Sequence, residues 1–278
     1  MFRLLITGGS SYLGQHLVPL ALSQVPEVVY TFFNNDPLGL PQGRYLDVRD
    51  GVAVEALVAA THPDAIIHTA GSNRPAETMK AVIREGTRHV AAAAATCGAR
   101  LVHLSTDVVF DGRHPPYAET DEPTPLHAYG RAKAVAERIV ARHPSHVIVR
   151  TSLIYGLQKL DRGTAWMVER LRASRPVTLF TDQIRNPVWV QSLSQACLEL
   201  AQHDYVGILH VAGAQRLSRA EFGQRMLDWW GVDRRETLGF GPSDPARCPL
   251  DCTLDIRRAQ AMLQTLLPGV DEVLARHR

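Results

Sequence analysis

Short apolar runs of strand length alternate along the first half of the chain with longer stretches in which apolar residues recur at helical spacing. This alternation is typical of βα units, in which crossover helices join parallel strands. The predicted strands are Phe2–Ile6, Val28–Phe33, Ala65–Thr69, Leu101–Ser105 and His146–Arg150, and the predicted helices are Leu13–Ser23, Val52–Thr61, Ala76–Cys97 and His127–Arg142. Because such crossovers are right-handed, the pattern predicts an α/β fold with a doubly wound parallel sheet.

The alternation loosens beyond Tyr155. There the pattern predicts helices at Thr164–Ala173, Leu193–Gln202 and Arg219–Trp230, and short strands at Val177–Phe180 and Ile208–Val211. We therefore expect residues 1–155 to form the doubly wound domain and residues 156–278 to form mainly a smaller C-terminal α/β lobe. Most of the four tryptophans fall on apolar helical or strand faces, and we expect them to be packing residues rather than platforms for a sugar.

A glycine-bearing turn, Thr7–Gly14, follows the first strand and opens the first helix. Backbone amides in such a turn can approach a pyrophosphate, and the helix N-terminus adds a favourable dipole. We expect Gly8 to make the tight turn and Gly14 to let the helix pack closely on the strand. Ser11 occupies the central position of a G-x-x-G-x-x-G pattern, where its Cβ limits backbone approach. An ordinary βα turn is the alternative for this motif taken alone.

The end of the second strand bears on the choice of dinucleotide. An acidic residue there favours NAD and an arginine favours NADP, but Asn34 and Asn35 are neither. Asp36 precedes Pro37, so we expect it to be a turn residue rather than a ribose ligand. The cofactor is thus NADP or NAD, with a slight preference for NADP.

Two segments carry residues suited to carbonyl chemistry. Ser105 and Thr106 end a strand, while Tyr129 and Lys133 lie one helical turn apart on the same face of a helix. An ammonium beside a phenol is expected to lower the phenol's pKa from about 10 and make its proton available. A Ser or Thr hydroxyl could hydrogen-bond the substrate carbonyl. Although Y-x-x-x-K alone is common, its distance from a strand that ends in Ser-Thr at the ligand-binding edge favours catalysis.

Motifs along nearly the whole chain resemble the dTDP-4-dehydrorhamnose reductase branch of the extended short-chain dehydrogenase/reductases. The motifs are Ser105–Gly112, Glu119–Asp121, Pro125–Lys133, Arg150–Gly156, Asp182–Pro187 and Pro249–Asp255. The resemblance implies an NAD(P)-binding Rossmann domain in residues 1–155 and a substrate-binding lobe in residues 156–278. It also implies an NAD(P)H-dependent oxidoreductase that reduces a keto group on a nucleotide-linked sugar.

The resemblance further implies roles for individual residues. Thr106, Tyr129 and Lys133 would be catalytic, with Tyr129 as the general acid and Lys133 also holding the nicotinamide ribose. The implied cofactor contacts are Gly8, Ser10, Ser11, Tyr12, Leu13, Gly14, Asn34, Asp47, Val48, Ala70, Gly71, Ser105, Tyr129 and Lys133. The implied substrate contacts are Asp107, Val108, Leu153, Arg185 and Arg247, the two arginines being suited to a diphosphate or, alternatively, solvated in loops.

Departures from the family pattern leave the substrate and even the activity open. Val108 and Leu153 stand where the rhamnose enzymes usually carry a tyrosine and a tryptophan, so a different nucleotide sugar, or none, fits this chain. A nucleotide-sugar epimerase or dehydratase is one alternative. Another is a cofactor-binding regulatory subunit like that of methionine adenosyltransferase, which acts by binding a partner enzyme. The presence of Thr106, Tyr129 and Lys133 in register favours the reductase.

Composition narrows the function classes further. The chain has 278 residues, a formal net charge of +2 and 45% hydrophobic residues, which is ordinary for a globular protein and calls for neither nucleic acid nor a membrane surface. Its 4 cysteines and 12 histidines show no metal-ligand spacing, so we expect no metal. The N-terminus lacks the apolar run of a signal peptide, and we expect a cytoplasmic protein, with a homodimer left open.

Overall fold

In the part of the chain that the computed structural model describes, residues 1–71, 79–233 and 235–278, seven parallel strands form a central sheet in the order β11-β6-β5-β4-β1-β2-β3. The strands are β1 (Arg3–Thr7), β2 (Glu27–Phe32), β3 (Gly43–Tyr45), β4 (Ala65–His68), β5 (Arg100–Thr106), β6 (His146–Thr151) and β11 (Gly207–His210). The order reverses between β1 and β4, which is the switch point where Rossmann folds bind their ligands. The predicted doubly wound fold is confirmed.

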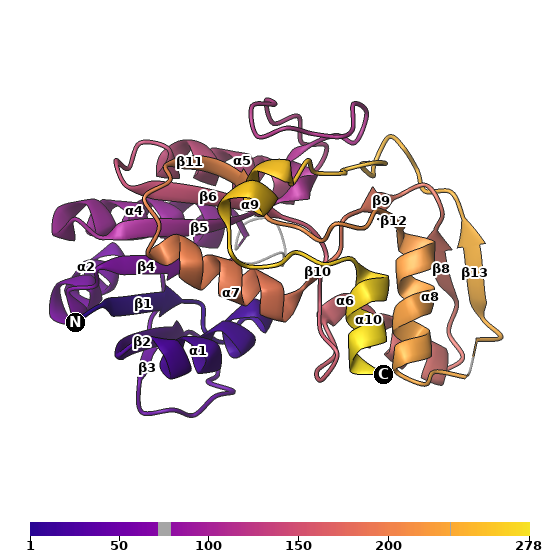
Figure 1. Ribbon diagram of the computed structural model, residues 1–278, viewed down its shortest axis with the longest axis horizontal. Coiled ribbons are helices and arrows are strands. Elements are labelled where there is room, and N and C mark those ends of the chain that lie inside the picture. Colours follow the sequence, from indigo (N-terminus) through magenta and orange to yellow (C-terminus); the bar gives the residue numbers. More distant parts are fainter. Residues whose placement is uncertain (72–78, 234) are drawn as a thin grey trace.

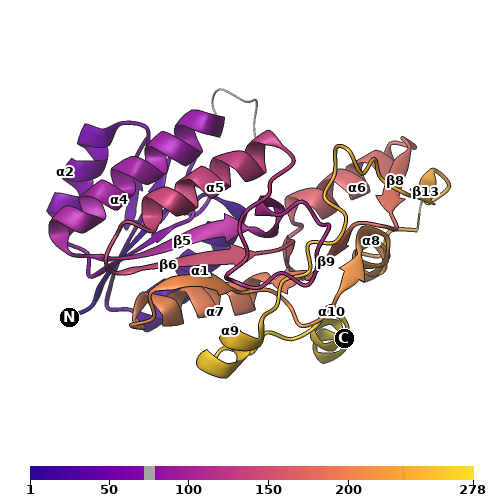
Figure 2. The same cartoon turned by 90° about the horizontal axis from the view of Figure 1, so that it is seen from above.

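Helices cover both faces of this sheet (Figures 1 and 2). On one face α1 (Tyr12–Gln24) packs beside α7 (Val190–Ala201), and on the other lie α2 (Gly51–Thr61), α4 (Gly86–Cys97) and α5 (Ala128–Val140). A π-helical segment, Ala81–Glu85, leads directly into α4. Of the predicted helix Ala76–Cys97, residues 76–78 lie outside the described residues. The two layers bury separate apolar clusters, one against each face of the sheet.

The smaller lobe follows β7 (Ile154–Tyr155), which pairs with β10 (Val188–Trp189). Its helices are α6 (Arg162–Arg172), α8 (Arg219–Trp229) and α10 (Val270–His277), and its strands are β8 (Val177–Phe180) paired with β13 (Leu238–Gly241) and β9 (Ile184–Arg185) paired with β12 (Leu217–Ser218). The short helix α9 (Arg257–Met262) lies against β11. Figure 1 shows α6, α8, β8 and β13 grouped at the end of the molecule opposite the N-terminus.

The chain returns to the central sheet after it has entered the smaller lobe. The helix and strand predicted at Leu193–Gln202 and Ile208–Val211 exist as α7 and β11, but β11 pairs in parallel with β6. These two elements therefore belong to the Rossmann part, which extends beyond residue 155. The apolar pattern of a strand does not reveal its pairing partner, and so sequence order alone placed both elements in the C-terminal lobe.

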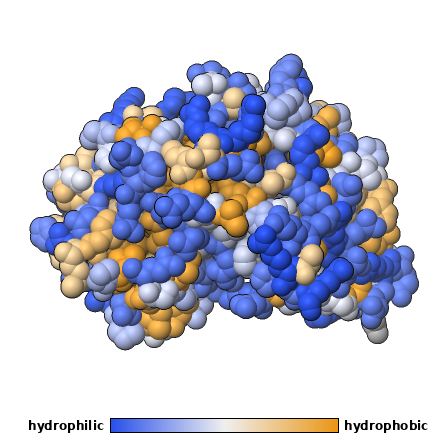
Figure 3. All heavy atoms as spheres, viewed as in Figure 1, coloured by the Kyte–Doolittle hydropathy of each residue, from blue (hydrophilic) through white to orange (hydrophobic). Residues whose placement is uncertain are grey.

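The face of the molecule seen in Figure 3 is mostly hydrophilic, with its apolar residues gathered mainly over the part that contains α1 and α7. Among the described residues, no helix is long and apolar enough to span a membrane.

Two histidines are buried side by side in the sheet. His68 on β4 and His103 on β5 are register partners, and their ring centroids lie 5.3 Å apart. His68 hydrogen-bonds the hydroxyls of Thr7 and Thr87 at 2.6 and 3.2 Å, whereas neither ring nitrogen of His103 has a hydrogen-bond partner among the described residues. Burial, together with the charge of Lys133, lowers the pKa of His68 to about 3 and the pKa of His103 well below its ordinary value. Both rings are therefore neutral at neutral pH.

We expect the substitution His103→Leu to reduce the loss of stability in acid. An imidazole that the fold keeps neutral takes up a proton on unfolding once the pH falls below about 6.5, so the free energy of unfolding decreases with pH from there. Without this imidazole, the decrease between pH 7 and pH 5 should be smaller by about 2 kcal/mol, as measured by urea denaturation. The control is His114→Leu at an exposed position. An unaltered acid dependence in the His103 variant would contradict this explanation.

Candidate active site

The turn between β1 and α1 has no room for side chains at its two key glycines. Gly8 has a φ of +80°, and a Cβ there would lie 2.6 Å from the backbone nitrogen of Ala70. A Cβ at Gly14 would lie 2.5 Å from the carbonyl oxygen of Gly8. Only glycine permits this approach of helix, turn and neighbouring strand. The turn therefore has the form of a phosphate cradle at a helix N-terminus, and it fits a dinucleotide.

Ser11 stands at the central glycine position of the G-x-x-G-x-x-G pattern, and its side chain makes contacts that a glycine could not make. Its Oγ accepts a hydrogen bond from the backbone N–H of Gly14 at 3.0 Å and lies 3.2 Å from the hydroxyl oxygen of Thr69. Its φ of −66° is ordinary for any residue, so nothing at this position requires glycine. Ser11 is thus the N-cap of α1, and it ties the turn to the end of β4.

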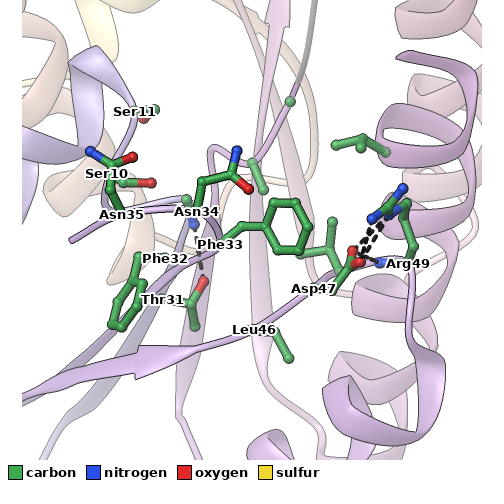
Figure 4. Close-up of a pocket in the computed structure, with 15 residues that line it drawn as sticks. Ser10, Ser11, Thr31, Phe32, Phe33, Asn34, Asn35, Leu46, Asp47 and Arg49 are labelled. Atoms are coloured by element: carbon green, nitrogen blue, oxygen red, sulfur yellow. Dashed lines mark hydrogen bonds and ion pairs between the residues drawn. The ribbon is translucent and has the colours of Figure 1, made fainter. Parts of the chain in front are cut away.

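A pocket of about 270 Å³ lies beside this turn, between the ends of β2 and β4 and the segment that follows β3. The predicted cofactor residues on its wall are Gly8, Ser10, Ser11, Asn34, Asp47, Val48, Ala70 and Gly71. Sequence reasoning missed Phe33 and Arg49. Figure 4 shows Asn34, Asn35 and Ser10 on one side of the Phe33 ring and the Asp47–Arg49 pair on the other.

Among the described residues that line this pocket, Arg49 is the cation. Its Nη2 lies 2.6 Å from a carboxylate oxygen of Asp47, and its guanidinium carbon lies 5.3 Å from the centre of the Phe33 ring. The hydrogen bonds from Arg49 hold the pKa of Asp47 below its usual range. The signal available in the sequence was that Arg49 follows the expected cofactor contact Asp47 by two residues. The sequence does not show that the segment containing both residues lies beside the end of β2.

Asp36 is a turn residue, as preferred from the sequence. Its carboxylate accepts hydrogen bonds from the hydroxyl of Tyr30 at 2.7 Å and from the backbone N–H of Leu38 at 3.1 Å. These bonds use Asp36 inside its own loop, and it does not line the pocket that holds Arg49.

A second pocket, of about 340 Å³, brings the predicted catalytic residues together. The turn contributes Ser11, Tyr12 and Leu13, and the far wall is formed by the ends of β5 and β6 with the start of α5. Thr106, Tyr129 and Lys133 all line it, and both Ser11 of the glycine turn and Gly71 lie on the walls of the two pockets. The two pockets therefore share their boundary at the glycine turn and form one continuous site along the carboxyl edge of the sheet.

The charges around the phenol differ from the sequence expectation. The Nζ of Lys133 donates a hydrogen bond to the carbonyl of Leu104 at 2.8 Å, and burial, opposed by the charge of Glu137, lowers the pKa of Lys133 to about 8. Burial and the carboxylate of Asp107 raise the pKa of Tyr129 to about 12. The expected lowering of the Tyr129 pKa by Lys133 is therefore wrong for this state of the chain. Asp107, which the helical spacing could not reveal, acts on the phenol in the opposite direction.

The two hydroxyls at the end of β5 have different surroundings. Ser105 is buried and donates to the carboxylate of Glu137, so its hydroxyl already has a partner. Thr106 is half-buried, and its hydroxyl makes a longer contact of 3.2 Å with Asp107. Thr106 is thus the hydroxyl better placed to receive a ligand.

The five expected substrate residues are scattered. Asp107 is 3% exposed and accepts from Ser152 at 2.6 Å, with Arg185 as an ion-pair partner at 3.5 Å. Arg185 is itself buried and donates to backbone carbonyls, whereas Arg247 lies in an exposed loop paired with Asp244. Neither arginine lines a pocket described above. Their expected role at a diphosphate lacks structural support, because existing partners or solvent already satisfy both guanidinium groups.

Val108 and Leu153, the positions that depart from the family pattern, are both half-buried. The carbonyl of Val108 lies so close to Gly130 at the start of α5 that a side chain could not fit there. Leu153 packs against an apolar cluster in the smaller lobe. Both positions therefore support the elements around the pocket.

Comparisons with known proteins give consistent relatives. A family model described as the RmlD substrate binding domain matches residues 2–277. A dTDP-4-dehydrorhamnose reductase of Mycobacterium tuberculosis is 34% identical over 245 residues, covering 83% of this chain and 76% of the relative. Methionine adenosyltransferase 2 subunit beta of Danio rerio is 26% identical over 280 residues, covering 90% and 83%. The crystal structure of dTDP-4-dehydrorhamnose reductase from Bacillus anthracis in complex with NADP aligns with a TM-score of 0.80 and 26% identity, covering 99% of this chain and 97% of that one.

We expect Gly14→Ala to weaken dinucleotide binding by about tenfold or more, because the added methyl group forces α1 away from the backbone of Gly8. Fluorescence titration with NADPH measures the effect. The control is Gly241→Ala, since Gly241 has open space around it and an ordinary φ. Equal NADPH affinity in the Gly14 variant and the unmodified chain would show that the turn does not hold the dinucleotide.

Proposed function

Since the chain belongs to the RmlD substrate-binding domain family, we propose that it is an NAD(P)H-dependent reductase of a keto group on a nucleotide-linked sugar. The observation that carries the proposal is that Thr106, Tyr129 and Lys133 line one pocket that adjoins the glycine turn. Relatives with reductase names and a structural neighbour in complex with NADP support the same chemistry.

Each residue of this pocket has a separate role in the reaction. When bound, the reduced nicotinamide supplies a hydride to the carbonyl carbon. Tyr129 donates its proton to the oxygen on which negative charge develops, and the Thr106 hydroxyl stabilises that charge by a hydrogen bond. Lys133, on the same pocket wall, would hold the nicotinamide ribose. With a Tyr129 pKa of about 12, the phenol holds its proton at neutral pH until the developing alkoxide takes it.

We infer that the cofactor is NADPH. Among the described residues, the end of β2 contributes two neutral asparagines, Asn34 and Asn35, to the pocket wall and no carboxylate that would repel a 2′-phosphate. Arg49 supplies a guanidinium at the same end of the pocket, held over Phe33. Asp47 offsets part of its charge, which is consistent with a preference for NADPH rather than an absolute requirement.

A second candidate is a cofactor-binding regulatory subunit, favoured by the similarity to methionine adenosyltransferase 2 subunit beta over 90% of this chain. An epimerase or dehydratase with the same motifs would regenerate its cofactor in every turnover, whereas a reductase consumes one reduced cofactor per product. Screening nucleotide-linked 4-keto sugars for oxidation of NADPH separates the three. If NADPH binds, no sugar is reduced and a protein partner co-purifies, the regulatory function replaces the reductase.

We expect Tyr129→Phe to lower kcat by about 100-fold or more on a responsive keto sugar, because it removes the proton donor and keeps the ring. Affinity for NADPH should stay within about twofold, since the phenol acts on the substrate. Stopped-flow turnover and fluorescence titration measure the two quantities. The control is Tyr45→Phe at a position where the residue is 65% exposed. Full turnover in the Tyr129 variant would exclude this residue as the acid.

We expect Arg49→Gln to reduce the preference for NADPH over NADH by about tenfold, because the 2′-phosphate loses a charge-assisted hydrogen bond. NADH affinity should change by less than about twofold, and Arg49→Lys should restore part of the preference. Dissociation constants for both cofactors, measured in parallel, give the ratio. Arg84→Gln serves as the control because Arg84 is exposed and outside the pocket. An unaltered ratio in the Arg49 variant would assign cofactor choice to another residue.

A further inference from the structure

The segment that joins β7 to α6, residues 157–161, is bound from both parts of the molecule, and we call it the connecting segment. From the Rossmann part, the hydroxyl of Tyr12 on the first turn of α1 donates to the backbone carbonyl of Lys159 at 2.8 Å. From the smaller lobe, the indole N–H of Trp229 on α8 donates to the backbone carbonyl of Leu157 at 3.1 Å. The connecting segment therefore links the helix that begins at the glycine turn to a helix of the smaller lobe.

Tyr12 brings this link directly to the glycine turn. It is the first residue of α1 and follows the N-cap Ser11, which contacts Thr69 at the end of β4. Tyr12 also lines the pocket that contains Tyr129. A Cβ at Gly156 would collide with the Tyr12 hydroxyl, so only glycine there lets the phenol reach the connecting segment. Sequence reasoning expected Tyr12 as a cofactor contact and gave no sign that its hydroxyl binds a segment far along the chain.

Two further features support this hydrogen bond. Burial and the carboxylate of Asp161 raise the pKa of Tyr12, so the phenol keeps its proton and remains a donor at neutral pH. One turn along α1, the side-chain amide of Gln15 donates to the carbonyl of Ser10 at 2.9 Å, and its oxygen accepts from the ammonium of Lys159. Two residues of α1 thus join the glycine turn to the connecting segment.

The other end of the connecting segment is anchored in the smaller lobe. Asp161 caps α6 by accepting from the backbone N–H groups of Gly163 and Thr164 at 2.9 and 3.0 Å. Leu157 and Leu160 pack against two apolar clusters of this lobe. A displacement of the segment would therefore displace α6 and disturb both clusters.

The tryptophans differ in this respect from one another. Trp229 packs against an apolar cluster of the smaller lobe, as expected, whereas Trp166 on α6 is 50% exposed and is not a packing residue.

On the basis of the proposed function, we propose that Tyr12 is a positioning residue through which a dinucleotide bound at the glycine turn orders the connecting segment and α6. The phosphates of a dinucleotide bind amides at the N-terminus of α1 and so restrain the first turn of that helix. Because Tyr12 lies in this turn, its restraint lowers the entropic cost of ordering the segment that its hydroxyl holds. The keto sugar, whose carbonyl must lie at Tyr129, then meets a lobe that is already ordered.

Hydrogen–deuterium exchange tests this coupling without turnover. In the unmodified chain, we expect saturating NADPH to slow amide exchange in residues 157–172 by about threefold or more, as well as in the turn itself. Tyr12→Phe keeps the ring and loses the hydroxyl, so the slowing should persist in the turn but fall to about half or less in residues 157–172. The matched control is Tyr205→Phe, because the Tyr205 hydroxyl donates to the carbonyl of Ile208 at 2.7 Å away from both pockets.

A kinetic measurement separates positioning from a merely structural role. On a responsive keto sugar, Tyr12→Phe should raise the KM for the sugar by about fivefold, the effect of one net hydrogen bond, and leave kcat within about twofold. A substitution that only destabilised the fold would instead lower the apparent kcat, since less enzyme would be folded, and would leave KM unchanged.

The outcomes separate this inference from the proposed function. If NADPH slows exchange in residues 157–172 of Tyr12→Phe as fully as in the unmodified chain, or slows it in neither, the positioning role is overturned even when the enzyme reduces a keto sugar. If the slowing depends on Tyr12 but no keto sugar is reduced, the role of Tyr12 stands and the reductase proposal fails. Absence of any binding of NADPH or NADH would overturn both.

Discussion

The geometry of the pocket that Thr106, Tyr129 and Lys133 line depends on one buried ion pair. Glu137 on α5 and Arg150 on β6 lie 2.8 Å apart with side chains that are 5% and 1% exposed, and Ser105 on β5 donates to the same carboxylate. Removal of one partner from such a pair costs about 3–5 kcal/mol, because the other charge is left buried and uncompensated. The pair fixes the rotation of α5 on the sheet. Because Lys133 lies one turn before Glu137 on the same helix, the pair also fixes the position of Lys133.

The same ion pair also fixes the segment that follows β5. The guanidinium of Arg150 lies 4.9 Å from the centre of the Phe110 ring, which stacks on Tyr117 at a centroid distance of 4.0 Å. Phe110 follows directly on the short 3₁₀ helix that begins at Asp107, after Thr106. Thr106 and Tyr129 come from different elements, but both elements are held by contacts to one arginine. Thr106 and Tyr129 therefore share a pocket because of the buried charged contacts of Arg150 as much as because of residue spacing along α5.

The features that could be predicted from the sequence are those that residues close together in the chain determine. The five strands predicted in the N-terminal half, now β1, β2, β4, β5 and β6, lie within one residue of their predicted ends because uninterrupted apolar runs leave little choice of boundary. The short edge strand β3 (Gly43–Tyr45) was missed because it has no such run. The turn was predictable because Gly8 and Gly14 meet steric limits set by nearby backbone. Non-local relations were not predictable. The pairing of β11 with β6, the approach of Arg49 to Phe33 and the action of Asp107 on Tyr129 all join segments whose spacing in the chain carries no such signal.

The arginines around the site show that a guanidinium group can be judged as an anion ligand only when the groups that already neutralise it are known. Sequence reasoning treated Arg185 and Arg247 as anion ligands because guanidinium groups suit diphosphates. In the fold, Arg185 is neutralised by Asp107 and by backbone carbonyls, and Arg247 pairs with Asp244. A cation whose charge is already balanced gains little from a new anion, since the ligand must compete with the existing partner.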